Sequence, residues 1–163
     1  ANLVVARPGF MSDAAEAGAD SLLIADIPAF EAEPFTREMQ QASIAPVLIA
    51  AANASPPALA KIAHLSQAYT YCVSRAGITG THAGGDFDRA LIARLQEAGA
   101  PPPIFGFGIS EPGHVRAALD AGAAGVICGS AIINLAGQTS HSPGDIADFV
   151  GSMKAATKVR IRA

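Results

Sequence analysis

The segment Ala-Gly-Ala occurs three times in the chain, each time shortly before an apolar run. The three copies are Ala17–Ala19, Ala98–Ala100 and Ala121–Ala123. Glycine adopts the left-handed conformation that ends many helices, so each copy predicts the end of a helix followed by the start of a strand. We call each of these helix-to-strand turns a corner. Three equivalent corners predict a chain that repeats one strand–loop–helix unit.

The apolar runs themselves predict buried parallel strands. Each is four to six residues long, rich in Val, Ile and Leu, and bounded by Gly, Pro, Asn or Ser. Runs that are apolar on both faces are typical of parallel sheets covered by helices. The predicted strands are Asn2–Ala6, Ser21–Asp26, Pro46–Ala51, Tyr69–Ser74, Pro103–Gly106 and Gly125–Gly129.

Helical periodicity appears between the runs. Apolar residues share one face over residues 59–66, 91–98 and 146–153. Ser55 before Pro56 and Ser142 before Pro143 predict N-caps followed by a proline at the first helical position. Ser110, which precedes Glu111 and Pro112, predicts a looser version of the same start.

Two architectures are built from such an array: an open doubly wound sheet and a (β/α)8 barrel. Six strands suit the open sheet by number, but its nucleotide-binding glycines follow the first strand. Barrels commonly hold phosphate after strands seven and eight. Here the glycine-rich exits follow the last two runs, so we predict an α/β fold, a (β/α)8 TIM barrel represented by about strands 3–8 with their helices.

A complete barrel usually takes about 250 residues, whereas this chain has 163. We therefore expect residues 1–163 to form a single phosphate-binding TIM-barrel domain that is truncated at its N-terminus. An incomplete barrel has two open strand edges, which favour aggregation.

Composition argues against several classes of function. The net charge is −3 and only 6% of residues are aromatic, and no basic stripe is present, so we expect no nucleic-acid partner. No apolar stretch reaches the roughly 18–20 residues of a membrane helix. The histidines lack ligand spacing, which predicts no metal site. Cys72 and Cys128 lie in apolar runs and predict buried thiols in a reducing, cytoplasmic compartment.

Two strand exits carry glycines that suit an anion. Ile104–Ser110 reads IFGFGIS, and Val126–Ile133 reads VICGSAII. Glycine lets the backbone approach a phosphate, and a short helix starting at Ser130 would direct its free amides at the same point. The helix dipole alone contributes only about 0.3–1 kcal/mol when exposed, so several amides must act together. The alternative is that these glycines only relieve crowding where strands become loops.

A third segment, Tyr71–Gly85, reads YCVSRAGITGTHAGG and leaves its strand with Arg75. Its glycines and its lack of apolar anchors predict a lid that closes over a ligand. An ordinary surface loop is the alternative interpretation.

Together these segments resemble the tryptophan synthase alpha chain family. The matching pieces are Ala19–Pro28, Tyr69–Gly80, Phe105–Ser110 and Ala121–Ile133, in the family's order and at about its spacing. The resemblance implies a (β/α)8 barrel that cleaves indole-3-glycerol phosphate into indole and glyceraldehyde 3-phosphate. It implies roles for eight residues: phosphate-binding Gly80, Gly108, Gly129 and Ser130, and substrate-binding Tyr71, Arg75, Thr79 and Phe107.

The resemblance also implies what this chain lacks. The family's catalytic glutamate and aspartate are expected upstream of residue 1, so no catalytic residue is predicted here. PLP is expected on a tryptophan synthase beta chain, the partner in an alpha2-beta2 complex. Ala76 replaces a serine common in the family's closing loop.

Two alternative functions remain open from the sequence. The chain could be a catalytically inert fragment that binds phosphate or docks on the beta subunit. It could also be another phosphate-binding barrel, such as a ribulose-phosphate epimerase or a phosphoribosyl isomerase. Those barrels share the glycine exits but not the Tyr-x-x-Ser-Arg-x-Gly-x-Thr-Gly segment that begins at Tyr71.

Overall fold

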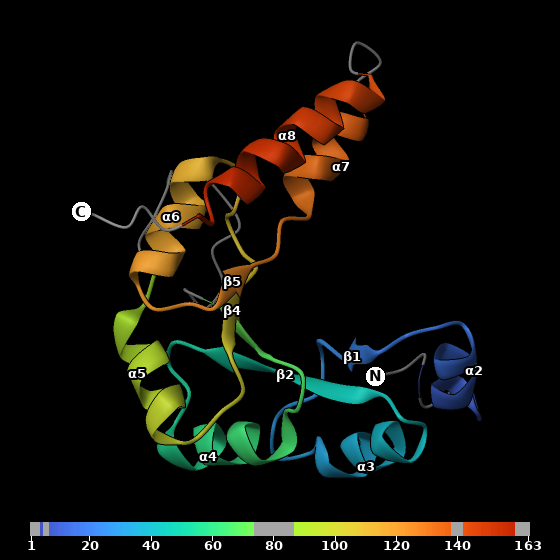
Figure 1. Ribbon diagram of the computed structural model, residues 1–163. Helices are drawn as coiled ribbons and strands as arrows, with labels where there is room; N and C mark the ends of the chain where they lie inside the picture. Colours follow the sequence, from blue (N-terminus) through green and yellow to red (C-terminus); the bar gives the residue numbers. More distant parts are fainter. Residues whose placement is uncertain (1–3, 5–6, 74–86, 138–141, 159–163) are drawn as a thin grey trace.

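The structure is a computed structural model that describes residue 4 and residues 7–73, 87–137 and 142–158. Helices and strands alternate along the chain as far as the last strand, which two helices follow (Figure 1). In chain order they are α2 (Phe10–Glu16), β1 (Ser21–Leu23), α3 (Glu33–Gln41), β2 (Ala45–Ala51), α4 (Pro56–Leu65), β3 (Thr70–Val73), α5 (Arg89–Glu97), β4 (Pro103–Phe105), α6 (Pro112–Asp120), β5 (Gly125–Val126), α7 (Ser130–Ala136) and α8 (Pro143–Ala155).

The strands form one parallel sheet in the order β1-β2-β3-β4-β5. A doubly wound sheet reverses its strand order at a switch point, and no reversal occurs among these strands. Figure 1 shows α3, α4, α5 and α6 following one another around the outside of the strands. A sheet in chain order with helices outside is the TIM-barrel arrangement. The predicted fold class, an incomplete (β/α)8 barrel, is confirmed.

Most predicted strands are present. β1, β4 and β5 are shorter than predicted, whereas β2 begins one residue earlier than predicted, at Ala45. The last one ends at Val126 instead of Gly129, because the chain there turns toward α7. The prediction of a strand at Asn2–Ala6 is wrong at the one residue of it that the structure describes, since Val4 is helical. Apolar periodicity over five residues does not distinguish a buried strand from a short helical turn.

The Ala-Gly-Ala corners have the predicted geometry. Gly18, Gly99 and Gly122 have φ values of 90°, 71° and 104°. After each glycine the next alanine N–H donates to the carbonyl five residues before it, for example Ala100 to Leu95 O at 2.9 Å. This is the Schellman arrangement, which satisfies carbonyls at the helix end. Each corner therefore fixes the direction in which the chain enters the following strand.

Two of the three predicted N-caps are confirmed. The Ser55 side chain accepts from Ala58 N–H at 3.4 Å, and Ser142 forms a reciprocal capping box with Asp145. The prediction at Ser110 is wrong, because Glu111 is the N-cap of α6 and its side chain makes no cap hydrogen bond. Pro112 occupies the first helical position, which assigns the cap to the residue directly before it.

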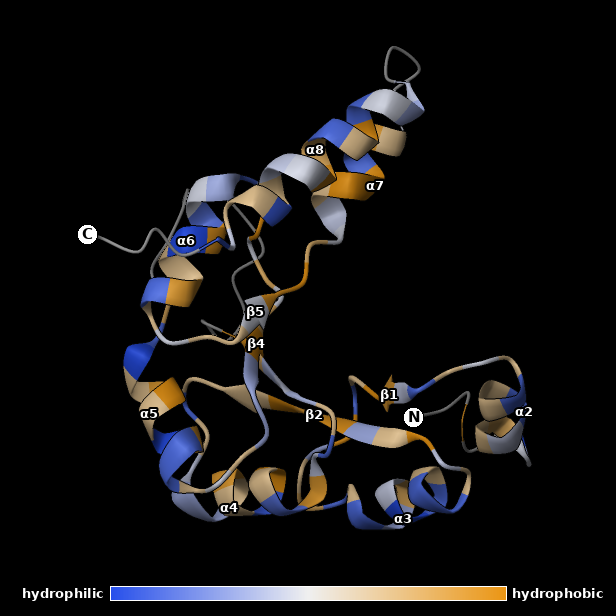
Figure 2. Cartoon of the chain, in the orientation of Figure 1, coloured by the Kyte–Doolittle hydropathy of each residue, from blue (hydrophilic) through white to orange (hydrophobic). Residues whose placement is uncertain are grey.

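The main core lies between the sheet and the helices that cover it. Figure 2 shows hydrophobic residues along β2 and β4 and hydrophilic residues on the outer faces of α3 and α5. Phe105, Leu91 and Cys72 are completely buried there. On α8, however, Met153 is buried while Val150 is 46% exposed, and α7 has no buried residue. Over the residues that the structure describes, no helix combines the length and apolar character needed to cross a membrane.

Candidate functional site

The segments that follow β4 and β5 begin side by side at one edge of the sheet. The two strands are paired in parallel. The N–H of Ile127 donates to the carbonyl of Phe105 at 2.8 Å, which continues the pairing beyond the end of β5. Residues 106–110 and 127–130, the two predicted glycine exits, therefore leave the sheet at the same level.

The exit from β4 brings two aromatic rings together. Phe107 lies edge-on to Tyr71 of β3, with ring centroids 6.1 Å apart and an interplanar angle of 79°. Phe107 is 49% exposed. A β-carbon at Gly106 would overlap the ring and hydroxyl of Tyr71, so only glycine leaves room for that ring. The sequence-predicted substrate residues Tyr71 and Phe107 are thus in contact at the strand mouth.

Tyr71 presents a neutral phenol to this mouth. Burial raises the pKa of Tyr71 above its ordinary value of 10.0, and the nearby Tyr69 adds a smaller effect in the same direction. At neutral pH the hydroxyl keeps its proton and can both donate and accept a hydrogen bond. The Tyr71–Phe107 pair therefore offers a flat, uncharged surface with one polar group.

The exit from β5 leads directly into a helix, as the sequence predicts. Gly129 is the N-cap of α7, and Ser130 is its first residue. The carbonyl of Gly129 accepts from the N–H groups of Ile132 and Ile133 at 3.0 and 3.1 Å. The first amides of a helix have no partner within the helix, so they are available to an anion.

Three predicted phosphate donors have unused amides in the described part of the chain. No backbone–backbone hydrogen bond between described residues uses the N–H of Gly108, Gly129 or Ser130. Gly108 has a φ of 74°, and a β-carbon at Gly108 or Gly129 would have no atom within 4 Å. Relief of crowding therefore explains Gly106 but not Gly108 or Gly129, where the space beside the backbone is open.

A cysteine links the two exits. The Cys128 thiol donates to the carbonyl of Ile109 at 3.1 Å. Burial raises the pKa of Cys128, and the backbone amides of Ile132 and Ala131 offset part of the shift. The thiol keeps its proton and acts as a donor. Sequence reasoning treated Cys128 only as a buried thiol, and its one signal was its place directly before Gly129.

The remaining predicted site residues, Arg75, Thr79 and Gly80, lie within residues 74–86, outside the described residues. Their roles, and the predicted lid, stay predictions.

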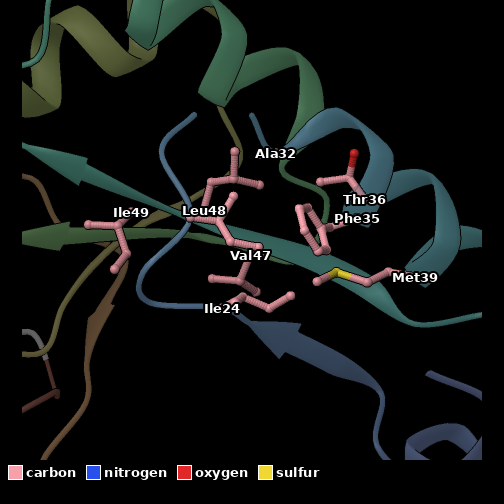
Figure 3. A pocket seen from close by; sticks show the side chains of 9 residues that line it. Ile24, Ala32, Phe35, Thr36, Met39, Val47, Leu48 and Ile49 are labelled. Atoms are coloured by element: carbon pink, nitrogen blue, oxygen red, sulfur yellow. The ribbon is translucent and has the colours of Figure 1, made fainter. Parts of the chain in front are cut away.

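A separate cavity lies between α3 and the strands β1 and β2 (Figure 3). Its lining is apolar except for Thr36, whose hydroxyl already donates to the Glu33 carbonyl at 3.1 Å. None of the predicted site residues lines it. The described residues also contain no group of three or more His, Cys, Asp or Glu side chains placed to hold a metal ion.

Comparison with known proteins connects this geometry to a family. The family model described as "Tryptophan synthase alpha chain" matches residues 1–158. The tryptophan synthase alpha chain of Shewanella oneidensis is 45% identical over 167 residues, which cover 96% of this chain and 59% of that protein. The alpha chain of Vibrio cholerae is 43% identical, covering 98% of this chain and 62% of that protein.

Solved structures agree with these relatives. A mutant tryptophan synthase alpha-subunit of Pyrococcus furiosus superimposes with a TM-score of 0.76 at 28% identity, covering 90% of this chain and 60% of that one. An alpha2-beta2 complex from the same organism gives a TM-score of 0.74 at 26% identity. This chain spans about 60% of the length of the curated relatives that it matches. It belongs to the tryptophan synthase alpha chain family.

Proposed function

We propose that the complete protein cleaves indole-3-glycerol phosphate into indole and glyceraldehyde 3-phosphate, as a lyase of tryptophan biosynthesis. The observation that carries the proposal is a set of amides at two neighbouring strand exits that donate to no backbone carbonyl of the described residues, in a chain of this family. The family match disfavours the epimerase and isomerase alternatives.

The phosphate is proposed to bind at the exits of β4 and β5. Amides of Gly108, Gly129 and Ser130 would donate to its oxygens, joined by Gly80 from the segment between β3 and α5. Hydrogen bonds to a charged acceptor are stronger than those between neutral groups. The open space beside Gly108 and Gly129 supports this assignment, because a bulky anion needs close approach to the backbone.

The indole ring is proposed to lie against Tyr71 and Phe107. Edge and face contacts between aromatic rings are favourable, and a neutral phenol suits an uncharged heterocycle. Arg75 and Thr79 are proposed to close over the substrate from the segment after β3, which would exclude water during the reaction.

The proton transfers are proposed to use carboxylates outside residues 1–163, as the family resemblance implies. Each positioned acid or base typically contributes a factor of about 10²–10⁴ in rate. We further propose that this chain needs no cofactor and that a beta chain holding PLP is its partner. The alpha2-beta2 complex named for the Pyrococcus furiosus protein supports that partner. A cytoplasmic location is part of the same proposal.

Gly129→Ala tests the phosphate site with little risk to folding. Gly129 has a φ of −119°, which alanine adopts, and its new methyl would meet no protein atom within 4 Å. That methyl would instead meet the phosphate. In the complete protein we expect KM for indole-3-glycerol phosphate to rise about tenfold or more, the equivalent of losing one hydrogen bond to a charged group. Indole formation measures the rate.

Gly151→Ala is the matched control, because it adds a methyl in open space on α8, away from the strand exits. We expect its KM to equal that of the parent protein. An unchanged KM in Gly129→Ala would overturn the phosphate assignment. If the isolated 163-residue chain binds glycerol 3-phosphate but forms no indole from indole-3-glycerol phosphate, the inert-fragment alternative is favoured.

A further inference from the structure

One peptide group in the exit from β4 is held on both of its polar atoms. This is the peptide that joins Ile109 to Ser110. Its carbonyl oxygen accepts from the Cys128 thiol at 3.1 Å, and its N–H donates to Nδ1 of His114 at 3.2 Å. The two side chains come from different segments, one at the exit from β5 and one in α6. These two hydrogen bonds fix the plane of the Ile109–Ser110 peptide, which begins one residue after Gly108.

His114 reaches this peptide because of its position in α6. The helix begins at Pro112 after the N-cap Glu111, so His114 is the third helical residue. In a capping box the side chain at that position reaches back to a backbone N–H at the helix start. Here the imidazole reaches one residue further back, to Ser110. The His114 side chain is 9% exposed, so solvent competes little for this bond.

The bond also determines which ring nitrogen carries the proton. Nδ1 accepts from a backbone N–H and must present a lone pair, so the proton of a neutral ring lies on Nε2. Nε2 is 3.2 Å from Oε1 of Glu111, although this contact does not have hydrogen-bond geometry. The Ser110 hydroxyl, 3.4 Å from Nδ1, can only supplement the backbone donor. The ring is therefore oriented by its contact with the Ser110 backbone.

We propose that His114 and Cys128 are positioning residues that hold the Ile109–Ser110 peptide and thereby fix the Gly108 amide relative to those of Gly129 and Ser130. This inference rests on the proposed phosphate site. The segment 106–110 contains two glycines, whose backbone freedom would otherwise spread the Gly108 N–H over many directions. Holding the peptide before the ligand arrives lowers the entropy that binding must overcome.

Four variants of the complete protein test the proposal, with glycerol 3-phosphate as the probe in calorimetric titrations. His114→Leu removes the acceptor, whereas the Oδ1 of His114→Asn occupies the place of Nδ1. Cys128→Ala removes the donor, whereas Cys128→Ser keeps one. We expect His114→Leu to weaken binding about fivefold to tenfold, the equivalent of one buried hydrogen bond, and His114→Asn to stay within about twofold of the parent. Cys128→Ala should weaken binding by only about twofold to threefold, because a thiol is a weaker hydrogen-bond donor than a backbone N–H. Cys128→Ser should restore the affinity, since its hydroxyl can donate to the same carbonyl.

A second readout does not depend on the ligand. Hydrogen exchange of the Ser110 amide, followed by NMR, should be faster in His114→Leu than in the parent and near the parent rate in His114→Asn. Because both side chains hold one peptide, the double variant His114→Leu/Cys128→Ala should lose less affinity than the two single losses combined.

Matched controls separate positioning from general destabilisation. Cys72→Ala removes a fully buried thiol that packs in the main core, and His64→Leu removes an exposed histidine of α4. Each should leave the affinity unchanged even where Tm falls. If His114→Leu does not fold, the test compares His114→Asn with His114→Gln. Gln places its acceptor one bond further from the backbone than Nδ1, so His114→Gln should bind more weakly than His114→Asn.

Equal affinity in the parent and His114→Leu would overturn the inference and leave the phosphate site standing. Equal losses in His114→Asn and His114→Leu would also overturn it, because the acceptor atom would then have no role. A parent protein that does not bind glycerol 3-phosphate would overturn the proposed function and the inference with it. That result differs from the first two, in which the parent binds.

Discussion

Cys72 and Cys128 carry the same side chain in two environments, and the environment decides what each thiol does. Cys72 lies in β3 with no exposed surface, and burial raises its pKa from 9.0 to about 12. Cys128 is partly exposed and donates to a carbonyl of the neighbouring exit. The predicted buried thiol is confirmed at Cys72. At Cys128 the structure adds a contact that links two segments.

The pKa of Cys72 makes stability fall at high pH. Its folded value lies above its unfolded value, so the unfolded chain releases the proton first. The stabilisation that the buried, protonated Cys72 thiol contributes is complete below about pH 9 and is lost as the pH rises toward about 12. The free energy of unfolding should fall by up to about 1.4 kcal/mol per pH unit in that window.

Denaturant titrations of the parent and Cys72→Ala at several pH values measure this contribution. The alanine variant should be less stable at pH 7 but should show a shallower decline above pH 9. Identical slopes in the two proteins would contradict the prediction, because the other groups that titrate there are common to both.

Gly106 should be intolerant of any side chain while Tyr71 is present. The added methyl of Gly106→Ala would overlap the Tyr71 ring, and overpacking of this kind costs about 1–3 kcal/mol. In a Tyr71→Ala background the same change should cost much less, because the ring is gone. A double-mutant cycle of unfolding free energies measures the coupling, and additive losses would show that the two residues do not compete for space.

At the scale of the helices and strands, one corner geometry recurs where helices lead into strands. Three corners use glycine, and a fourth uses Ser43, which has a φ of 62°. Ile44 N–H donates to Met39 O at 2.8 Å and Ser43 N–H to Gln40 O at 3.0 Å, which is the pattern of the glycine corners. The sequence repeat missed this corner because its residue is not glycine. At Ser43 the backbone turns into β2, which begins two residues later at Ala45.

Ser43 and Gly99 should respond to substitution in opposite directions. A side chain in the left-handed region costs about 1–2 kcal/mol, partly offset by the flexibility of glycine in the unfolded chain. Ser43→Gly should therefore raise the free energy of unfolding by up to about 1 kcal/mol, and Gly99→Ser should lower it by a similar amount. Both positions are exposed, and a β-carbon at Gly99 meets no atom within 4 Å. Thermal and urea unfolding measure both, and changes of the same sign would refute the backbone explanation.

At the scale of the whole molecule, the described sheet has two outer strands, β1 and β5, each with one strand neighbour. Beside β5 the helices α7 and α8 extend away from the sheet (Figure 1), with Ile133 71% and Val150 46% exposed. Open strand edges and exposed apolar side chains both favour association with another chain.

The isolated 163-residue chain should therefore self-associate. Sedimentation velocity over a range of protein concentrations should show species larger than a monomer. Ile133→Lys should reduce the association, since a charge would have to be buried in the contact. Lys substituted at the exposed Asn134 is the control and should have little effect. A monomer at all concentrations would contradict the prediction.

Much of this protein follows from local patterns in its sequence. The Ala-Gly-Ala corners, the Ser-Pro helix starts at Ser55 and Ser142, and the buried runs of β2 and β4 depend on neighbours within a few residues. Backbone sterics and hydrogen bonds over that range act on any chain that carries those residues. The repeat and the position of the glycine exits predicted the barrel, which the structure confirms. The phosphate-binding roles of Gly108, Gly129 and Ser130, which the family resemblance implies, stay predictions.

Only the tertiary structure decided how the exits are held. Tyr71 meets Gly106 across 35 residues of chain, and Cys128 and His114 meet at one peptide from opposite sides. No spacing rule in the sequence relates these residues. Their contacts exist because parallel pairing brings β3, β4 and β5 to one level, and side-chain geometry then determines which atoms come within hydrogen-bond distance.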